Sequence, residues 1–501
     1  MAERPALDPL APGLMVCGTA SNAGKSTIVA GLCRLLARRG VRVAPFKAQN
    51  MALNSAVTVS GHEIGRAQFS QAQAAGTEAS VDMNPVLIKP TSDTDAQIVV
   101  NGKPFATMTA AEYHKHKPEL FELVLTALQR LRREFDAVVL EGAGSPAEIN
   151  LAASDIVNLR VAERAGLSAI VVGDIDPGGV FASLFGTVAL LPPSQRELVR
   201  GFVINKFRGD PVLLGDGLAD IERRCDVPVL GVLPMLDSIQ IDAEDSVALS
   251  ELPPPSADAH LDVAVIAFPC LSNFTDFDPL FAEPDVAVRF VRSVRELGRP
   301  DVIVLGGSKA TAQDLAWMRS RGLAQAVEAA ASDHDAVVLG ICGGYQMLGR
   351  SITDEVESRC GRVPGLGLLD VETVFEDSKV LAQRRGEAFG GHVEGYQIHH
   401  GRVRLCVDAE GEPWLWLDGE SDGWRNGRVM GTSLHGVFDA DGFRHAFLAH
   451  VAAIGGCGFA PTPGSFAARR DEQFDRVADS LAAHLDVEAL WEMMGIAALT
   501  A

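Results

Sequence analysis

The stretch from Leu14 to Thr27, LMVCGTASNAGKST, decides the fold of the first half of the chain. It begins with an apolar run that predicts a buried strand, and the residues after it, TIVAGLCRLLARRG, predict a helix. A glycine-rich turn between a strand and a helix points backbone N–H groups at an anion. The segment therefore predicts a nucleotide-binding P-loop, in which Lys25 reaches the terminal phosphates and the Ser26 hydroxyl ligates Mg²⁺. The residues assigned to this nucleotide site are Thr19, Gly24, Lys25, Ser26 and Thr27.

Apolar runs alternate with helical patterns on both sides of the P-loop, which is typical of parallel α/β sheets. The pattern breaks at ELPPPSADAH (251–260), and a second α/β series begins with LDVAVIAFP (261–269). We therefore expect two α/β domains, an ATP-binding one at 1–252 and a second at 261–445. A linker at 253–260 joins them, and a helical extension follows at 446–501.

Composition narrows the class of protein. The chain has 501 residues, of which 47% are hydrophobic and 22% charged, as in a soluble globular protein. Its 44 Lys and Arg against 65 Asp and Glu give a formal charge of −21. This balance argues against nucleic acid or an anionic membrane as a partner. The eight cysteines include no C-x-x-C pair, so they favour neither a metal knuckle nor a disulfide framework. Because disulfides are rare in reducing compartments, we expect a cytoplasmic protein.

The P-loop has Thr19 where the common form has its first glycine, and G-T-x-S-x-x-G-K-S resembles the dethiobiotin synthetase branch of P-loop proteins. In that branch the nucleotide activates a carboxylate. The resemblance implies that Lys47, in PFKAQN, faces the reacting carboxylate and that Glu141, in VVLEGAG, holds Mg²⁺. Asn205, in GFVINKF, matches the position that reads adenine, although an asparagine after a strand is often only a turn residue.

A nucleophile is indicated in the second domain by VVLGICGGYQMLG, which places Cys342 between an apolar strand and a helix. A tight turn of this kind needs glycine, exposes the sulfur and sets it at a helix N-terminus that favours thiolate. The G-x-C-G-G context makes a merely structural buried cysteine less favoured. Cys342 is therefore the predicted nucleophile.

A cysteine nucleophile needs a base from elsewhere in the chain. His435, in GTSLHGVFD, has the expected setting at a strand end before a glycine; the competing histidines are His334, His392, His399 and His400. A loop after the strand PDVIVLGG offers backbone N–H groups to an oxyanion. The residues predicted for this oxyanion and glutamine pocket are Gly306, Gly307, Ser308 and Gly343.

The second domain resembles a class I glutamine amidotransferase, of flavodoxin-like fold, in the subtype found in the cobyrinate amidases. Most class I enzymes carry a glutamate two residues after the histidine, whereas here Gly436 and Val437 follow His435. The subtype lacks that glutamate as a rule. Asp439 is a candidate for the residue that orients His435.

A closer resemblance is to the cobyric acid synthase family. The segments that carry it occur in the order FKAQNMALNS, MNPVLIKP, EGAGSPAEINL, DIDPGGVFASLFGT and INKFRGD. The similarity spans Leu14 to Phe443. It implies amidation of the four peripheral carboxylates b, d, e and g of adenosylcobyrinic acid a,c-diamide, with ATP, Mg²⁺ and glutamine and no permanently bound prosthetic group. It also implies that Asp155 handles substrate or the acyl phosphate. An amide cluster could bind the macrocycle, although a polar helix face is the simpler interpretation. Its members are Gln49, Asn50, Asn54, Gln68, Gln71 and Gln73.

The chain departs from the family pattern at Pro177, where an arginine is usual, and at Gln397, where a glutamate is usual; His400 and the segment around Asp155 also differ.

Rival interpretations are cobyrinic acid a,c-diamide synthase, an amidase of a lipid-linked cell-wall glutamate, a partitioning-type P-loop switch ATPase and a non-catalytic scaffold. FKAQNMALNS disfavours the first, and the fusion of both activities in one chain disfavours the second. The switch ATPase often has a second lysine early in its P-loop, which positions 19–22 lack. The oligomeric state is not predicted.

Overall fold

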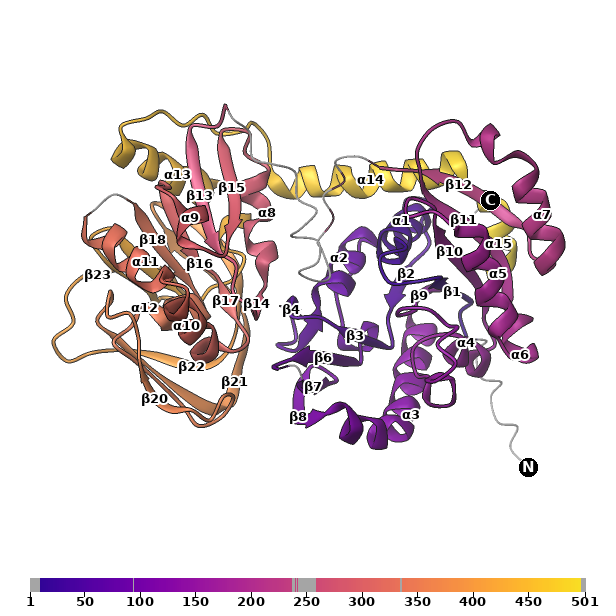
Figure 1. Cartoon of the computed structure of the whole chain (residues 1–501), viewed down its shortest axis with the longest axis horizontal. Helices are drawn as coiled ribbons and strands as arrows, with labels where there is room; N and C mark the ends of the chain where they lie inside the picture. The colour runs from indigo at the N-terminus through magenta and orange to yellow at the C-terminus, as the bar shows by residue number, and fades with distance from the viewer. Residues whose placement is uncertain are drawn as a thin grey trace, which may run out of the picture.

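The computed structural model describes residues 10–496, except residues 93, 237–238, 240, 242–257 and 334–335. Two α/β lobes lie next to each other, and helix α14 (Phe466–His484) runs from the edge of the C-terminal lobe along one side of the N-terminal lobe (Figure 1). The expected linker at 253–260 lies mostly outside the described residues. No helix within the described part of the chain is long and apolar enough to cross a membrane.

The N-terminal lobe contains a parallel sheet with the strand order β12-β11-β10-β1-β9-β2. Its strands are β1 (Gly13–Gly18), β2 (Val43–Phe46), β9 (Ala137–Glu141), β10 (Ser168–Asp174), β11 (Val199–Phe207) and β12 (Val229–Pro234). Strand β1, which precedes the P-loop, lies between β10 and β9 in the interior of this sheet. The carboxyl ends of neighbouring strands therefore meet around the P-loop, where open α/β sheets bind ligands.

Successive residues of β1 face opposite sides of the sheet, and both sides are covered. Met15 and Cys17 belong to one buried cluster, whereas Leu14 and Val16 belong to another. The first side is covered by α3 (Ala110–Glu134), α4 (Leu159–Ala165) and α5 (Val180–Leu190). The second side is covered by α1 (Lys25–Arg38), α14 and α15 (Val487–Met494). Strands buried on both faces explain the continuous apolar runs of the sequence.

Smaller elements of the N-terminal lobe lie toward the other lobe (Figure 1). One sheet has the order β3-β6-β7-β8, with β3 (Gln49–Met51), β6 (Val86–Pro90), β7 (Asp95–Val100) and β8 (Lys103–Thr109). A hairpin consists of β4 (Ser55–Val57) and β5 (Glu63–Gly65), and α2 (Arg66–Ala74) follows it directly.

Two further helices of the N-terminal lobe, α6 (Pro193–Arg196) and α7 (Gly215–Cys225), lie on its side away from the other lobe (Figure 1).

The C-terminal lobe contains a mixed sheet whose parallel part has the order β15-β13-β16-β18-β25. These strands are β13 (Leu261–Ile266), β15 (Val286–Val291), β16 (Val302–Leu305), β18 (Val337–Ile341) and β25 (Val429–Thr432). The sheet continues through β24, β23, β21, β19 and β20, and β22 pairs with β21. These are β19 (Ser351–Asp354), β20 (Gly361–Pro364), β21 (Val371–Ala388), β22 (Gly391–Leu405), β23 (Glu412–Leu417) and β24 (Glu420–Asn426). A short pair, β14 (Leu271–Ser272) and β17 (Gly307–Ser308), lies beside this sheet.

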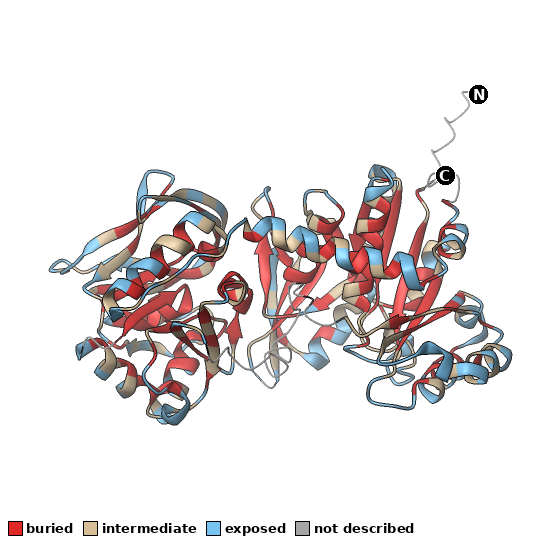
Figure 2. Cartoon of the chain, turned by 90° about the horizontal axis from the view of Figure 1, so that it is seen from above, coloured by how far each residue is buried: buried red, intermediate tan, exposed pale blue. Residues whose placement is uncertain are grey.

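Helices cover the parallel part of the C-terminal sheet, and buried residues fill the interior of both lobes (Figure 2). These helices are α8 (Asp278–Phe281), α9 (Val294–Leu297), α10 (Thr311–Ser320), α11 (Leu323–Ser332), α12 (Gly343–Leu348) and α13 (Asp441–Gly455). The two α/β domains that the sequence predicts are therefore confirmed. The C-terminal extension divides between them, because α13 packs in the C-terminal core while α14 and α15 pack on the N-terminal sheet.

Candidate active site

The P-loop lies between β1 and α1, as its sequence predicts. Gly24 has a φ of 93°, and a Cβ at this position would lie 2.2 Å from Asn205 Nδ2, so a side chain here would be both strained and obstructed. Lys25 Nζ donates to the carbonyls of Ala20 (2.8 Å) and Gly144 (3.2 Å), which keeps the ammonium inside the loop. The backbone N–H of Thr19 donates to Val172 O (2.9 Å) and ties the start of the loop to β10.

A buried carboxylate stands at the centre of this site. Glu141 Oε1 accepts hydrogen bonds from Ser26 Oγ (2.8 Å) and Lys47 Nζ (2.9 Å), and Oε2 accepts from Gln71 Nε2 (2.6 Å). Although burial alone raises the pKa of Glu141, the Lys47 ammonium and these hydrogen bonds lower it below its ordinary value. Glu141 is therefore ionised, and three residues predicted from sequence meet at one point. The sequence does not predict that Gln71 contacts Glu141.

A cavity of about 710 Å³ opens beside this cluster and is lined by N-terminal residues. Four lysines line it, and they give it a local positive charge within an acidic protein: Lys25, Lys47, Lys117 and Lys206. Lys206 is paired with Asp174 at 2.8 Å. Burial lowers the pKa of Lys117. A cavity of this kind suits a large polar substrate that carries carboxylates.

Asp155 and Asn205 lie near the P-loop, but each contacts the backbone. Asp155 Oδ1 accepts from the N–H groups of Val157 (2.9 Å) and Asn158 (3.2 Å) at the start of α4, and the residue lines the cavity. Asn205 Nδ2 donates to Ala23 O of the P-loop (2.9 Å). The structure therefore shows Asn205 bracing the loop.

The amide cluster that the sequence suggests for a macrocycle does not stay together. Gln49 and Asn50 line the large cavity, whereas Gln71 contacts Glu141. Gln68 Oε1 accepts from Asn50 Nδ2 (3.0 Å). Asn54 lies at the contact between the lobes, where its Oδ1 accepts from a backbone N–H of the C-terminal lobe. Only part of the cluster is therefore available to a ligand in the cavity.

The second site is built on the turn between β18 and α12. Cys342 has φ 51° and ψ −105°, a conformation that non-glycine residues rarely adopt. This strained conformation is typical of a nucleophile elbow, the sharp turn between a strand and a helix that exposes the nucleophile. The Cys342 N–H donates to Thr432 O (2.8 Å). Gly344 must be glycine, because a Cβ there would lie 1.9 Å from Leu305 O. The predicted nucleophile elbow is present.

A histidine and an acid complete the site. His435 Nδ1 is 2.7 Å from Asp276 Oδ2, and the N–H of Gly436 donates to Asp276 Oδ1 (2.9 Å). Cys342 is also hydrogen-bonded to His435. Burial by itself lowers the pKa of His435, but Asp276 and Cys342 raise it to about 10. The imidazole is therefore protonated at neutral pH, and Cys342, His435 and Asp276 form a triad.

Asp276 corrects the suggestion that Asp439 orients His435. The acid belongs to a short 3-10 turn, Phe274–Phe277, and lies 159 residues before the histidine. Asp439 instead lies 3.9 Å from Arg470. Nothing in NFTDFDP distinguishes Asp276 from the other acids of the sequence, so only the fold identifies it.

The competing histidines have other contacts. His399 Nδ1 is 2.7 Å from Gly401 O, and burial lowers its pKa to about 4. His400 Nδ1 is 2.9 Å from Glu376 O, and burial lowers its pKa too. Both remain neutral and line the small cavity at Cys342. His392 is exposed, and His334 lies outside the described residues.

Backbone groups of the predicted oxyanion loop face the nucleophile turn. A Cβ on Gly343 would lie 2.7 Å from Ser308 N, and one on Gly307 would lie 2.9 Å from the His435 ring. Gly306 O accepts from Gly344 N (3.0 Å) and joins the loop to α12. The Ser308 hydroxyl donates to Asp314 Oδ2 (2.5 Å), so this side chain holds the loop in place.

Two residues that depart from the family pattern differ in their surroundings. Pro177 is exposed before α5 and does not line the large cavity. Gln397 accepts from Arg384 Nε (3.1 Å) and donates to Asp422 Oδ1 (2.7 Å), one residue after the tyrosine that stacks on His435. A glutamate at this position would place a second carboxylate beside Asp422.

Comparisons with known proteins agree with the division into two domains. Residues 14–247 match the family model described as CobQ/CobB/MinD/ParA nucleotide binding domain. Residues 262–443 match the CobB/CobQ-like glutamine amidotransferase domain. A nucleotide-binding domain of this family joined to a glutamine amidotransferase defines a glutamine-dependent amidoligase.

Relatives of the whole chain narrow the class further. A cobyric acid synthase from Mycolicibacterium paratuberculosis is 52% identical over 483 residues, covering 95% of each chain. Those of Streptomyces coelicolor and Rhodococcus jostii are each 51% identical, covering 96% and 97% of this chain and 96% of each relative. The chain belongs to the cobyric acid synthase family.

Proposed function

We propose that this protein converts adenosylcobyrinic acid a,c-diamide into cobyric acid by amidating its b, d, e and g carboxylates with ammonia made from glutamine. The observation that carries the proposal is the presence of two complete reaction centres in one chain. One is the Ser26–Glu141–Lys47 cluster beside the P-loop, and the other is the triad at Cys342. The names of the relatives support the choice of product.

The first half-reaction activates the substrate. A carboxylate oxygen attacks the γ-phosphorus of ATP, the bond to ADP breaks, and an acyl phosphate forms. Lys25 neutralises charge on the transferred phosphoryl group, and Lys47 lies where it can hold the attacking carboxylate. We assign Asp155 to the far side of this cavity, where it orders the turn that faces the acyl phosphate. We assign Thr27 and Gly24 to phosphate contacts and Asn205 to the nucleotide side of the loop.

The residues present also fit Mg²⁺. The Ser26 hydroxyl and the Glu141 carboxylate are hard oxygen donors 2.8 Å apart, and nucleotide phosphates would supply further oxygens. When bound there, the ion would neutralise charge on the phosphates and orient them. Glu141 is already ionised, so no proton has to leave before the ion binds.

The second half-reaction makes ammonia. The Cys342 thiolate attacks the side-chain amide carbon of glutamine, and the oxyanion is stabilised by N–H groups of the loop at Gly307, Ser308 and Gly343. His435 gives its proton to the leaving nitrogen, ammonia departs and a thioester remains. Water then hydrolyses the thioester to glutamate, with His435 as the base. Asp276 keeps the imidazole oriented throughout.

Ammonia then attacks the acyl phosphate, phosphate leaves and an amide forms. Because ammonia is mostly protonated in water at neutral pH, we propose that it passes between the lobes without entering bulk solvent. We place the reaction in the cytoplasm, since eight free cysteines suit a reducing compartment.

The proposal is tested by incubating the protein with ATP, Mg²⁺, adenosylcobyrinic acid a,c-diamide and glutamine that carries heavy nitrogen in its amide. We expect four heavy nitrogens in the corrinoid by mass spectrometry and one glutamate released for each. An unchanged a,c-diamide together with amidation of cobyrinic acid would instead assign the protein as cobyrinic acid a,c-diamide synthase. ATP hydrolysis without amidation of either corrinoid would contradict the proposal.

A further inference from the structure

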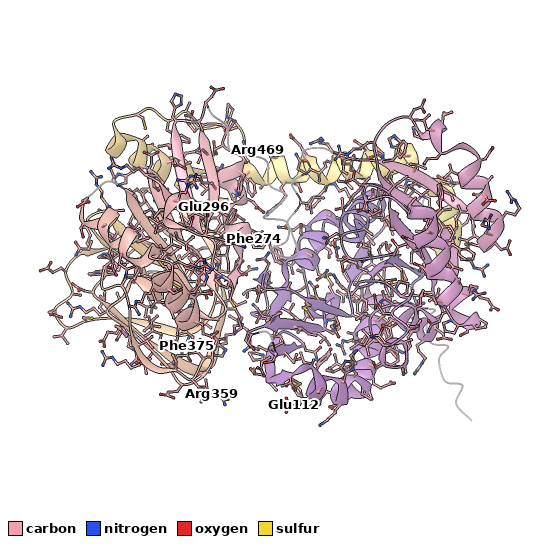
Figure 3. All side chains as sticks on the ribbon, viewed as in Figure 1. Glu112, Phe274, Glu296, Arg359, Phe375 and Arg469 are labelled. Carbon is pink, nitrogen blue, oxygen red and sulfur yellow. The ribbon has the colours of Figure 1, made fainter. Side chains whose placement is uncertain are left out.

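Residues Asn54 and Ser55 of the N-terminal lobe touch the turn that carries Asp276. Asn54 Oδ1 accepts from Phe274 N (3.2 Å), and Ser55 N donates to Asn273 Oδ1 (3.0 Å). Figure 3 shows Phe274 on the side of the C-terminal lobe that faces the N-terminal lobe. Asn273 and Phe274 begin the 3-10 turn that holds Asp276 against His435. The position of the acid therefore depends on a contact with the other lobe.

Ser55 is also connected to His435 through Tyr396. Tyr396 OH donates to Ser55 O (3.0 Å), and the Tyr396 ring stacks on the His435 ring at 5.4 Å with an interplanar angle of 20°. The backbones of Tyr396 and His435 exchange two hydrogen bonds, at 3.0 and 2.9 Å. Both supports of the imidazole, the acid and the stacked ring, are thus fixed to Asn54 and Ser55.

These contacts are closed to water. Asn54 is 1% exposed, Ser55 0%, Asn273 2% and Tyr396 7%. A buried hydrogen bond that is lost here cannot be replaced by one to solvent, so its loss shifts or strains the groups that it joined. The cavity at Cys342 is correspondingly small, about 30 Å³, and residues of both lobes line it.

A continuous path leads from Asn54 to the ATP site. Asn54 O accepts from the N–H of Arg66 (3.2 Å), the first residue of α2. Gln71, one and a half turns along the same helix, donates to Glu141 (2.6 Å) and to Ser26 O (3.3 Å). Helix α2 therefore joins Glu141 and Ser26 at the ATP site to Arg66 and Asn54 at the contact between the lobes.

We propose that Asn54 and Tyr396 are positioning residues that hold the glutaminase triad from the amidoligase lobe, and that α2 transmits the state of the ATP site to them. The inference rests on the proposed function, since it assigns the two sites to ammonia production and to its use. It assigns to Asn54 and Tyr396 an effect on the turnover of glutamine, with no contact to either substrate.

The experiment measures glutamate release and corrinoid amidation for four variants, with glutamine or with ammonium as the nitrogen source. Asn54→Ala removes the acceptor for Phe274, and Asn54→Asp keeps it. Tyr396→Phe removes only the hydroxyl and leaves the ring on His435. Gln383→Ala is the matched control, because Gln383 Nε2 also crosses between the lobes, to Val57 O (3.0 Å). Gln383 lies opposite Tyr396 in the β21–β22 pair, but this side-chain hydrogen bond goes to Val57 and not to the triad.

We expect Asn54→Ala and Tyr396→Phe to lower kcat for glutamine by roughly ten- to a hundredfold while KM for glutamine stays within about twofold. We also expect the ratio of the glutamate-release rate with ATP and the corrinoid to the rate without them to fall toward one. Asn54→Asp should recover most of the rate, and Gln383→Ala should behave as the wild type. Amidation with ammonium should be unchanged in all four variants.

The inference is overturned if Asn54→Ala and Tyr396→Phe retain wild-type kcat and stimulation. It is equally overturned if Gln383→Ala loses as much, or if ammonium-dependent amidation falls in parallel, because both results would indicate a general loss of lobe packing. The proposed function fails separately, when the wild type itself amidates no corrinoid with ammonium.

Discussion

The two cavities of this chain contrast in size and in the lobes that build them. The cavity beside the P-loop measures about 710 Å³ and is lined by residues of the N-terminal lobe. The cavity at Cys342 measures about 30 Å³ and is lined from both lobes, with Lys89 contributed by the N-terminal one. The cavity for carboxylate activation, as we propose it, is therefore built by one lobe, whereas the cavity at the proposed glutaminase nucleophile is built by both.

The largest expected effect is on the site that one lobe builds. Glu141→Gln removes the carboxylate charge at the oxygen that accepts hydrogen bonds from Lys47 and Ser26. We expect the rate of amidation to fall by roughly four orders of magnitude, as with other groups that stabilise charge in phosphoryl transfer. The loss should be the same with glutamine and with ammonium, measured by product formation from the corrinoid. Amidation that persists with ammonium would place carboxylate activation elsewhere.

The next effect concerns the site that both lobes build. Asp276→Asn removes the acid that holds His435, and we expect glutaminase kcat to fall by up to roughly ten-thousandfold, as when the acid of a catalytic triad is made neutral. Ammonium-dependent amidation should be retained, because Asp276 does not reach the large cavity.

The same variant predicts a change in pH dependence. The raised pKa of His435, about 10, keeps its proton available to the leaving nitrogen below that pH, and wild-type kcat should fall as pH rises through it. Without the Asp276 carboxylate the pKa drops, so this alkaline limb should move to lower pH. An alkaline limb that stays in place would show that Asp276 is not coupled to the histidine.

A smaller effect is expected from the buried charges between the lobes. Glu63 accepts from Lys89 (2.6 Å) in its own lobe and from Lys379 (2.6 Å) in the other, and all three are at most 5% exposed. Glu63→Gln leaves two buried lysines without their carboxylate and should cost about 3 kcal/mol in urea unfolding. Breaking the exposed pair of Arg38 and Asp479 by Arg38→Ala should cost less than about 1 kcal/mol. Equal costs would show that the interface charges are solvated.

The smallest effect tests how the nucleotide loop is braced. Asn205→Ala removes one hydrogen bond to Ala23 O, which is worth about 1 kcal/mol, so KM for ATP should rise by roughly fivefold with kcat nearly unchanged. Steady-state kinetics with varied ATP and saturating ammonium measure this. A large fall in kcat would mean that Asn205 contacts the reacting groups.

The sequence predicts those parts of the sites in which local pattern and chemistry coincide. A glycine-rich turn between strand and helix specifies the P-loop, and a cysteine in a G-x-C-G-G context specifies the elbow, because backbone geometry at both places restricts the residues allowed. His435, at the end of an apolar strand, is likewise predicted, whereas the roles of Lys47 and Glu141 are implied by the resemblance to the dethiobiotin synthetase branch.

What the sequence could not predict depends on contacts between distant segments. Asp276 has no local signature, and its role arises only when its turn is brought to His435. Gln71 looked like part of a polar helix face until the fold placed it on Glu141. The return of α14 and α15 to the first lobe was also missed, since an amphipathic pattern shows that a helix packs but not against what.

The most direct test of the account is Cys342→Ala, assayed for corrinoid amidation with glutamine and, separately, with ammonium. The account predicts no amidation and no glutamate release with glutamine, but formation of the same tetra-amidated product with ammonium and ATP. Amidation that continues with glutamine would contradict the assignment of Cys342. Loss of the ammonium reaction in a folded variant would contradict the division of the two reactions between the lobes.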